Sequence, residues 1–90
     1  MTIEIGKIYE LVHSNKVETI VFDNNFEELT TLPKGSTFIP LELLDTFSAK
    51  EAYKSIYQGE DEIYKVRILT SSGKIGFCSF WTSEIKIVEN

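Results

Sequence analysis

The feature of this sequence that most constrains its fold is an alternating pattern over residues 63–80, interrupted by one turn. Apolar and polar residues alternate over residues 63–69, and strand-forming residues return over residues 74–80. Between these runs, residues 70–73 read Thr-Ser-Ser-Gly, a composition typical of a hairpin turn. Because side chains alternate between the two faces of a strand, the pattern predicts two antiparallel strands joined by a tight turn.

The two faces of this predicted hairpin differ in chemistry. One face of the first strand carries the apolar residues Tyr64, Val66 and Ile68. The other face carries Lys65 and Arg67, so we expect the apolar face to lie against a core. In the return strand, the missing side chain of Gly76 predicts a close approach by another segment of backbone.

Shorter strand patterns occupy much of the remaining chain. They cover residues 7–13, 17–22, 37–43 and 85–88. Turn signals separate them at residues 23–25 (Asp-Asn-Asn), at residues 81–84, and at residues 33–35 (Pro-Lys-Gly), where we expect a type I turn with glycine in fourth position. Pro40 lacks an N–H and therefore predicts a sheet edge or a bulge.

Two segments depart from the period of two. Phe26, Leu29 and Leu32 are spaced by three, which predicts an irregular loop packed on the core. Residues 48–51 (Ser-Ala-Lys-Glu) match a capping box, in which serine and glutamate satisfy free N–H groups of a helix's first turn. An apolar stripe with helical spacing follows: Ala49, Ala52, Tyr53, Ile56 and Tyr57. We therefore expect one short helix over about residues 48–58, stopped by Gly59.

Length and charge limit the class of protein. Ninety residues allow one domain, spanning residues 1–90. Fourteen acidic and nine basic side chains give a net charge of −5, which repels duplex nucleic acid and anionic membranes. The acidic residues are concentrated in residues 1–62, whereas residues 63–90 are slightly basic. We therefore expect neither duplex nucleic acid nor a membrane as a partner.

Cysteine usage indicates the compartment. Cys78 is the single cysteine of the sequence, so no internal disulfide can form. The first residues lack the basic segment and long apolar run of a secretory signal, and no apolar run approaches the roughly 18 residues of a membrane span. These features predict a reducing, cytoplasmic location.

The strand count and several motifs resemble a known family. Five to six short antiparallel strands in 90 residues favour a small, closed or nearly closed barrel. Residues 32–35 (Leu-Pro-Lys-Gly) precede a strand, residues 64–66 read Tyr-Lys-Val, and residues 73–77 read Gly-Lys-Ile-Gly-Phe. This order of motifs resembles bacterial SH3-like domains, in which a short turn and a last strand follow. The resemblance implies a mainly β, SH3-like barrel, with residues 44–62 and their helix inserted in place of a short loop.

The resemblance also implies a ligand groove lined by aromatic residues near the last turn. The candidate partner-binding residues are Tyr9, Tyr64, Phe80 and Trp81. A barrel of this size also needs aromatic residues in its core, so core packing is the alternative role for the same side chains. The sequence lacks the tandem tryptophans and the Pro-Ser-Asn-Tyr stretch of eukaryotic SH3 domains, which argues against proline-rich ligands.

A second candidate site is basic. Lys65 and Arg67 share a strand face, and the hairpin brings Lys74 alongside them. Together they could hold a small anionic ligand or a nucleotide. The alternative is an ordinary solvated face of the sheet.

Catalytic and metal-binding patterns are weak. His13 and Cys78 are the one possible nucleophile and base pair of the Cys/His kind, but neither lies in a known local motif, and Cys78 reads as a small core residue. One histidine and one cysteine cannot form a structural zinc site, and no calcium-loop or phosphate-loop motif is present. We therefore expect no enzyme activity, metal or cofactor.

These observations lead to two hypotheses about function. The first is a non-catalytic cytoplasmic module that binds a protein partner through the aromatic groove or the helix, with a phage or mobile-element inhibitor of a host protein as one version. The second is a binder of small anions or nucleotides through Lys65, Arg67 and Lys74. A core this small is often supplemented by self-association, so a homo-oligomer is also an option.

Overall fold

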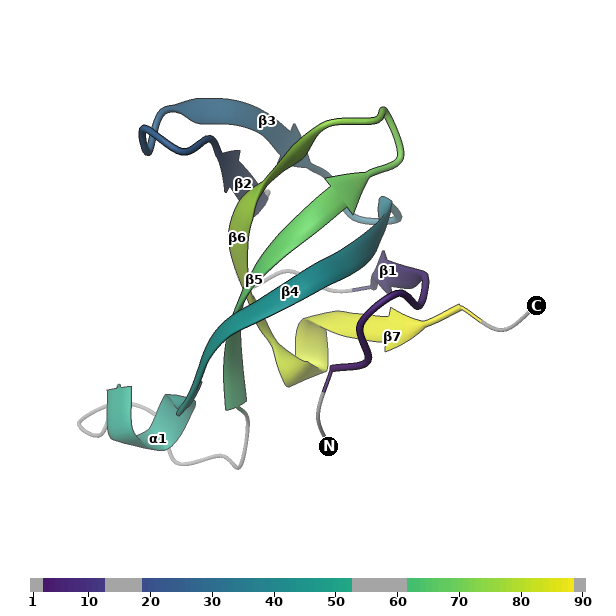
Figure 1. Cartoon of the computed structure of the whole chain (residues 1–90). Helices are drawn as coiled ribbons and strands as arrows, with labels where there is room; N and C mark the ends of the chain where they lie inside the picture. Colours follow the sequence, from purple (N-terminus) through teal and green to yellow (C-terminus); the bar gives the residue numbers. More distant parts are fainter. Residues whose placement is uncertain (1–2, 13–18, 53–61, 89–90) are drawn as a thin grey trace.

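Antiparallel strands make up most of the described part of the chain in this computed structural model (Figure 1). The structure describes residues 3–12, 19–52 and 62–88. The elements in chain order are β1 (Tyr9–Leu11), β2 (Thr19–Phe22), β3 (Glu28–Leu32), β4 (Thr37–Ser48), α1 (Ala49–Ala52), β5 (Glu62–Thr70), β6 (Ile75–Trp81), a 3₁₀ turn (Thr82–Glu84) and β7 (Ile85–Ile87). The predicted mainly β fold is therefore confirmed, with seven strands in the described residues where five or six were expected.

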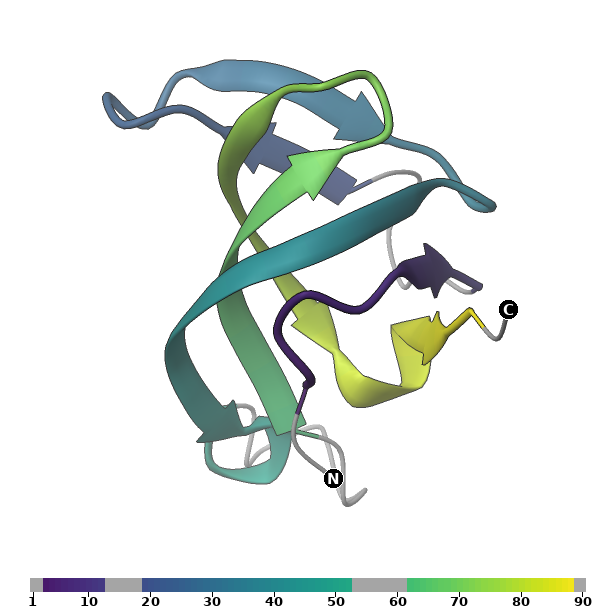
Figure 2. The same cartoon turned by 45° about the vertical axis from the view of Figure 1, so that its right-hand side comes forward.

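All seven strands belong to one sheet, which curls into a half-barrel (Figure 2). Their order in space is β3-β2-β6-β5-β4-β1-β7. The meander β4-β5-β6 forms the centre, and the β2–β3 hairpin extends it beyond β6. On the other side, β1 lies between β4 and β7, so the first and last strands of the chain are neighbours.

The central meander confirms the strand pattern that constrains the fold most. In β5 and β6 the register pairs Val66 with Cys78 and Arg67 with Phe77. The turn between them is closed by a 2.9 Å hydrogen bond from the Gly73 N–H to the Thr70 carbonyl. Tyr64, Val66 and Ile68 are buried, as the alternation predicted. Lys65 is exposed on the opposite face.

The pairing of β4 with β5 corrects the predicted insertion. β4 pairs with β5 as far as Ser48, opposite Glu62, so residues 44–48 extend the sheet and do not begin a separate segment. Ser48 is consequently the last strand residue, where the prediction made it the first residue of a helix over 48–58. The described helix is one turn, Ala49–Ala52, and residues 53–58 of the predicted helix lie outside the described part of the chain. Pro40 lies at a β-bulge, as expected.

One predicted loop and one predicted turn differ in the structure. Residues 28–32 form strand β3, where an irregular loop was expected, because they pair with β2 along its length. The turn after Pro33 begins one residue later than predicted. Its hydrogen bond runs from the Ser36 N–H to the Pro33 carbonyl, with Gly35 in third position at φ +93°. A positive φ at the third residue is the requirement of a type II turn and explains the glycine there.

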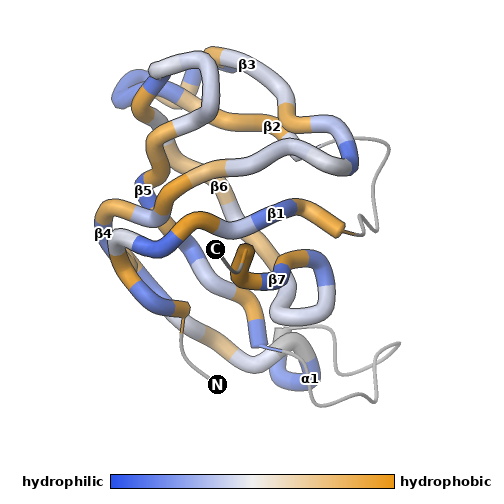
Figure 3. The backbone as a smooth tube through the Cα atoms, turned by 90° about the vertical axis from the view of Figure 1, so that its right-hand side faces the viewer, coloured by the Kyte–Doolittle hydropathy of each residue, from blue (hydrophilic) through white to orange (hydrophobic). Residues whose placement is uncertain are grey.

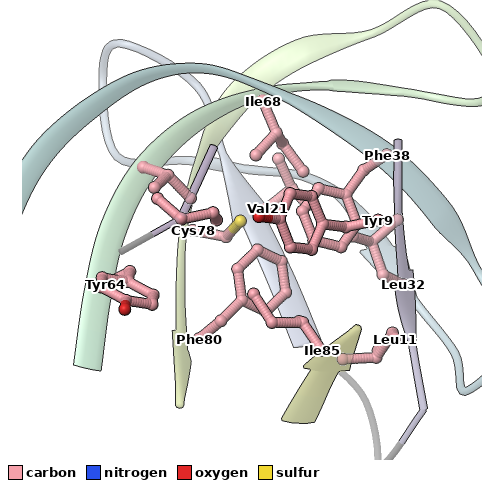
Figure 4. Close-up of a cluster of buried hydrophobic side chains, with 12 residues drawn as sticks. Tyr9, Leu11, Val21, Leu32, Phe38, Tyr64, Ile68, Cys78, Phe80 and Ile85 are labelled. Atoms are coloured by element: carbon pink, nitrogen blue, oxygen red, sulfur yellow. The ribbon is translucent and has the colours of Figure 1, made fainter. Parts of the chain in front are cut away.

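The hydrophobic core lies on the inner face of the curled sheet (Figure 4). The rings of Tyr9, Phe38 and Phe80 stack in its centre, with centroids 6.0 Å apart for the first pair and 4.6 Å for the second. Each fully buried side chain of this size contributes roughly 1.5–3 kcal/mol of transfer free energy. Cys78 belongs to this cluster, which confirms its prediction as a small core residue.

A short 3₁₀ turn connects β6 to β7 and fixes the last strand. The Trp81 N–H donates a 2.8 Å hydrogen bond to Oε1 of the buried Glu84. The Glu84 carbonyl in turn accepts a 2.8 Å hydrogen bond from the Val12 N–H, just after β1. This turn therefore ties the end of β6 to β1 and directs β7 along it.

The described residues contain no helix that is long and apolar enough to cross a membrane.

Candidate functional site

Three of the four predicted groove residues lie in the core. Tyr9, Tyr64 and Phe80 are 4%, 1% and 0% exposed. Their rings therefore pack inside the sheet and offer no aromatic surface to a partner, which is the alternative role that the sequence left open. Trp81 is partly exposed at the end of β6. At these three positions the burial agrees with core packing, and Trp81 is the one predicted groove residue with accessible surface.

Tyr64 combines burial with a polar contact. Burial raises the pKa of its hydroxyl above the ordinary value of 10.0, and the nearby negative charge of Glu62, which also accepts a hydrogen bond from this hydroxyl, raises the pKa further. The hydroxyl therefore stays neutral to a more alkaline pH than that of an ordinary tyrosine. It acts as a satisfied structural group of the core rather than as a proton donor to a ligand.

Exposed apolar side chains gather instead on the outer face of the sheet. β2 contains three consecutive apolar residues, which makes its tube predominantly orange in Figure 3. Val21 faces the core, whereas Ile20 and Phe22 on either side of it face outward and are exposed. The register places Phe22 opposite Phe77 of β6, which also lies on the outer face. The two phenylalanines therefore lie on neighbouring strands of one surface.

Two adjoining surface cavities occupy this face. The first, of about 330 Å³, is lined by Thr19, Ile20, Phe22, Phe26, Lys65, Phe77, Cys78 and Ser79. The second, of about 280 Å³, is lined by Phe26, Leu44, Asp45, Lys65 and Phe77. Because Phe26, Lys65 and Phe77 line both cavities, they form one continuous feature, which we call the outer-face groove. A larger depression of about 690 Å³ lies on the other side of Phe77, next to Arg67 and Glu42.

A tight turn between β2 and β3 positions Phe26 in the groove. The Phe26 N–H donates to the Asp23 carbonyl at 3.0 Å, and the Asp23 carboxylate accepts from the N–H groups of Asn25 and Glu27 at 2.8 and 3.0 Å. Phe26 itself has φ +59°, the one described residue other than glycine with a positive φ. Its side chain is 78% exposed, which corrects the expectation that it packs on the core.

The three predicted anion-binding residues do not line a common cavity among the three described above. Arg67 donates a 3.2 Å salt bridge to Glu42, and its guanidinium lies 5.0 Å from the centre of the Phe77 ring. Lys65 lines both cavities of the groove, whereas Arg67 lines the larger depression. Lys74 follows the β5–β6 turn and lines none of the three. Arg67 is thus paired with Glu42, Lys65 lines the outer-face groove, and Lys74 lines neither the groove nor the larger depression.

The Cys/His pair cannot be placed from the described residues. Cys78 is buried in the core, and His13 lies outside the described part of the chain. Among residues 3–12, 19–52 and 62–88, no group of three or more His, Cys, Asp or Glu side chains is arranged to hold a metal ion.

The sequence did not single out Phe22, Phe26 and Phe77 as site residues. A signal was present for Phe77, since it shares the strand parity that places Lys65 and Arg67 outside. For Phe26 the signal was its position directly after the Asp-Asn-Asn turn, where a large apolar residue is unusual.

The fold and this surface together define a small, mainly β protein with an apolar groove on the outer face of its sheet. Comparison of the chain with protein-family models, with curated proteins and with solved structures finds no match.

Proposed function

We propose that this chain is a non-catalytic binding module that engages a protein partner through the outer-face groove. The carrying observation is that phenylalanines gather around two adjoining cavities: Phe22 and Phe26 are exposed, and Phe77 is partly exposed. Contiguous exposed apolar surface destabilises a free protein in water, and it commonly marks an interaction site. Aromatic side chains also provide large contact areas for little loss of conformational entropy.

We assign the scaffold to the SH3-like barrels on the order of its elements. A glycine turn at residues 33–36 precedes β4, the β5–β6 hairpin follows, and a 3₁₀ turn leads to a last strand beside β1. This order supports the resemblance of the motifs, and folds of this kind host many unrelated binding functions. The buried single thiol of Cys78 supports a reducing, cytoplasmic setting for the module.

The alternative of an anion or nucleotide site receives less support from the geometry. Arg67 already pairs with Glu42, and Lys65 and Lys74 do not share any of the three cavities described above. A thermal-shift panel of nucleotides and small anions tests this reading. Mass action would raise the melting temperature if the alternative held, whereas the proposed function predicts no shift at ligand concentrations up to about 1 mM.

The proposed function is tested by capturing partners on the immobilised whole chain from an extract of the source cells. The Phe77→Thr variant removes an aromatic side chain that lines both cavities of the groove while keeping a strand-forming residue. The matched control is Ile8→Thr, which changes an exposed apolar residue that lines neither cavity of the groove. We expect a protein that is retained by the wild type and the control but lost with Phe77→Thr. No retained protein, or equal retention by both variants, would refute the proposal.

A further inference from the structure

The backbone conformation of Phe26 is unfavourable for the stability of the fold. A left-handed backbone conformation is sterically costly for a bulky L-residue, and this place in a hairpin turn favours glycine or asparagine. The side chain gains little in return, because 78% of it stays in contact with solvent. Residues that combine backbone strain with exposure are typical of functional sites. The turn therefore presents Phe26 for contact with another molecule.

Lys65 supplies a positive charge beside this ring. It lies on the exposed face of β5 and lines both cavities together with Phe26 and Phe77. In residues 3–12, 19–52 and 62–88 no carboxylate forms an ion pair with it, in contrast to Arg67. A cation at the edge of an apolar cavity favours a ligand that carries both an apolar group and a negative charge.

The two cavities differ in how well they would accept a negative charge. The second contains Asp45, which would repel a carboxylate. The lining of the first has Lys65 as its one charged side chain, so a carboxylate placed there would pair with Lys65, which faces Asp45 across the β4–β5 pairing on the side of the second cavity. The apolar group of such a ligand would then lie among Phe22, Phe26 and Phe77, which line the same cavity.

We infer that the outer-face groove binds a short segment of a partner protein in which a large apolar side chain stands next to Asp or Glu. Phe26 contacts the apolar side chain, and Lys65 pairs with the carboxylate. This inference rests on the proposed function and adds the chemistry of the partner to it. The net charge of −5 acts against acidic segments at long range, but at contact distance the nearest charge outweighs distant ones at physiological salt.

The inference is tested by selecting binders from a displayed library of random heptapeptides on the immobilised whole chain. Four baits are compared: the wild type, Lys65→Glu, Phe26→Asn and Lys74→Glu. The last is the matched control, since it makes the same charge change at a lysine outside the cavities. Circular dichroism of each bait establishes that it is folded.

We expect the wild type and Lys74→Glu to enrich peptides with a large apolar residue beside Asp or Glu. Lys65→Glu should reverse the preference to Lys or Arg and weaken the best wild-type peptide by roughly tenfold or more. Phe26→Asn should lose enrichment while remaining folded. Enrichment without an acidic preference, or an unchanged preference on Lys65→Glu, would overturn this inference and leave the proposed function standing. If no peptide is enriched and the capture experiment also retains no protein, both fail.

Discussion

Gly76 of β6 lies so close to Val21 of β2 that a Cβ atom on the glycine would come within 2.6 Å of the valine Cγ1. The same atom would come within 2.7 Å of the Phe22 carbonyl oxygen. The absence of a side chain at Gly76 therefore lets the β2–β3 hairpin lie against β6. This contact also sets the separation of Phe22 and Phe77, on which the groove depends.

We predict that Gly76→Ala lowers the free energy of unfolding by about 2–3 kcal/mol, because the backbone carbonyl cannot move aside as a flexible side chain could. Chemical denaturation measures this loss. Ser79→Ala, on the same strand, is the control and should stay within about 0.5 kcal/mol of the wild type. If Gly76→Ala were as stable as the wild type, β2 would not pack against β6 as described.

Substitutions at Phe26 should change the stability of the fold according to how well each residue tolerates a positive φ. Asparagine tolerates a positive φ, so Phe26→Asn should raise the free energy of unfolding by about 0.5–1 kcal/mol. Phe26→Val places a β-branched residue at the same φ and should lower the free energy of unfolding. Thermal denaturation of the two variants provides the comparison. If both variants shifted in the same direction, backbone strain at this position would not be the cause.

The carboxylate of Glu84 should matter for stability through the Trp81 N–H. Glu84→Ala removes the carboxylate that accepts this hydrogen bond and should lower the free energy of unfolding by about 1–3 kcal/mol. Glu84→Gln keeps an oxygen acceptor of the same length and should retain most of the stability. Equal losses in the two variants, measured by urea denaturation, would argue against this hydrogen bond as the reason for burying Glu84.

The ion pair between Arg67 and Glu42 should contribute little to the free energy of unfolding. The two side chains are 41% and 53% exposed, so water and salt screen their attraction. A double-mutant cycle with alanine at both positions should give a coupling free energy of about 0.2–1 kcal/mol, reduced in 1 M salt. A coupling above about 2 kcal/mol would indicate a much less solvated pair.

The raised pKa of Tyr64 predicts a loss of stability at alkaline pH. When the folded-state pKa exceeds the unfolded value, the stabilisation is complete below the unfolded value of 10.0 and is lost as pH rises through the folded value. The wild type should therefore lose stability above about pH 10 more steeply than Tyr64→Phe, which has no hydroxyl to ionise. Denaturation midpoints of both proteins between about pH 8 and 11 test this. If the stabilities of the two proteins changed in parallel with pH, a raised pKa of Tyr64 would be contradicted.

The β5–β6 hairpin could be predicted from the sequence because its determinants are local. The alternation over residues 63–69 and the Thr-Ser-Ser-Gly turn fix both the pairing and the faces without reference to the rest of the chain. The burial of Tyr64 and the exposure of Lys65 follow directly from that alternation. Local signals also predict a short turn over residues 81–84 and a last strand over 85–88, where the structure has a 3₁₀ turn at Thr82–Glu84 and β7 at Ile85–Ile87.

The extent of β4 and the position of the groove could not be predicted in the same way. Bulges between Pro40 and Glu42 and between Leu43 and Asp45 shift the parity of β4, so alternation no longer reports which face a residue occupies. The groove depends on β2 pairing with β6, a contact between segments more than 50 residues apart. No local pattern records that pairing, so Phe22 and Phe77 could not be recognised as neighbours.

The placement of β1 between β4 and β7 has a consequence for the order in which the chain folds. The β4-β5-β6 meander needs only neighbouring segments and can form early. β1 gains its second set of ladder hydrogen bonds only when residues 85–87 are present, which joins segments about 75 residues apart. A growing chain on the ribosome therefore carries one edge of β1 uncovered until residues 85–87 have been synthesised, and an uncovered strand edge is a template for pairing with a second nascent chain.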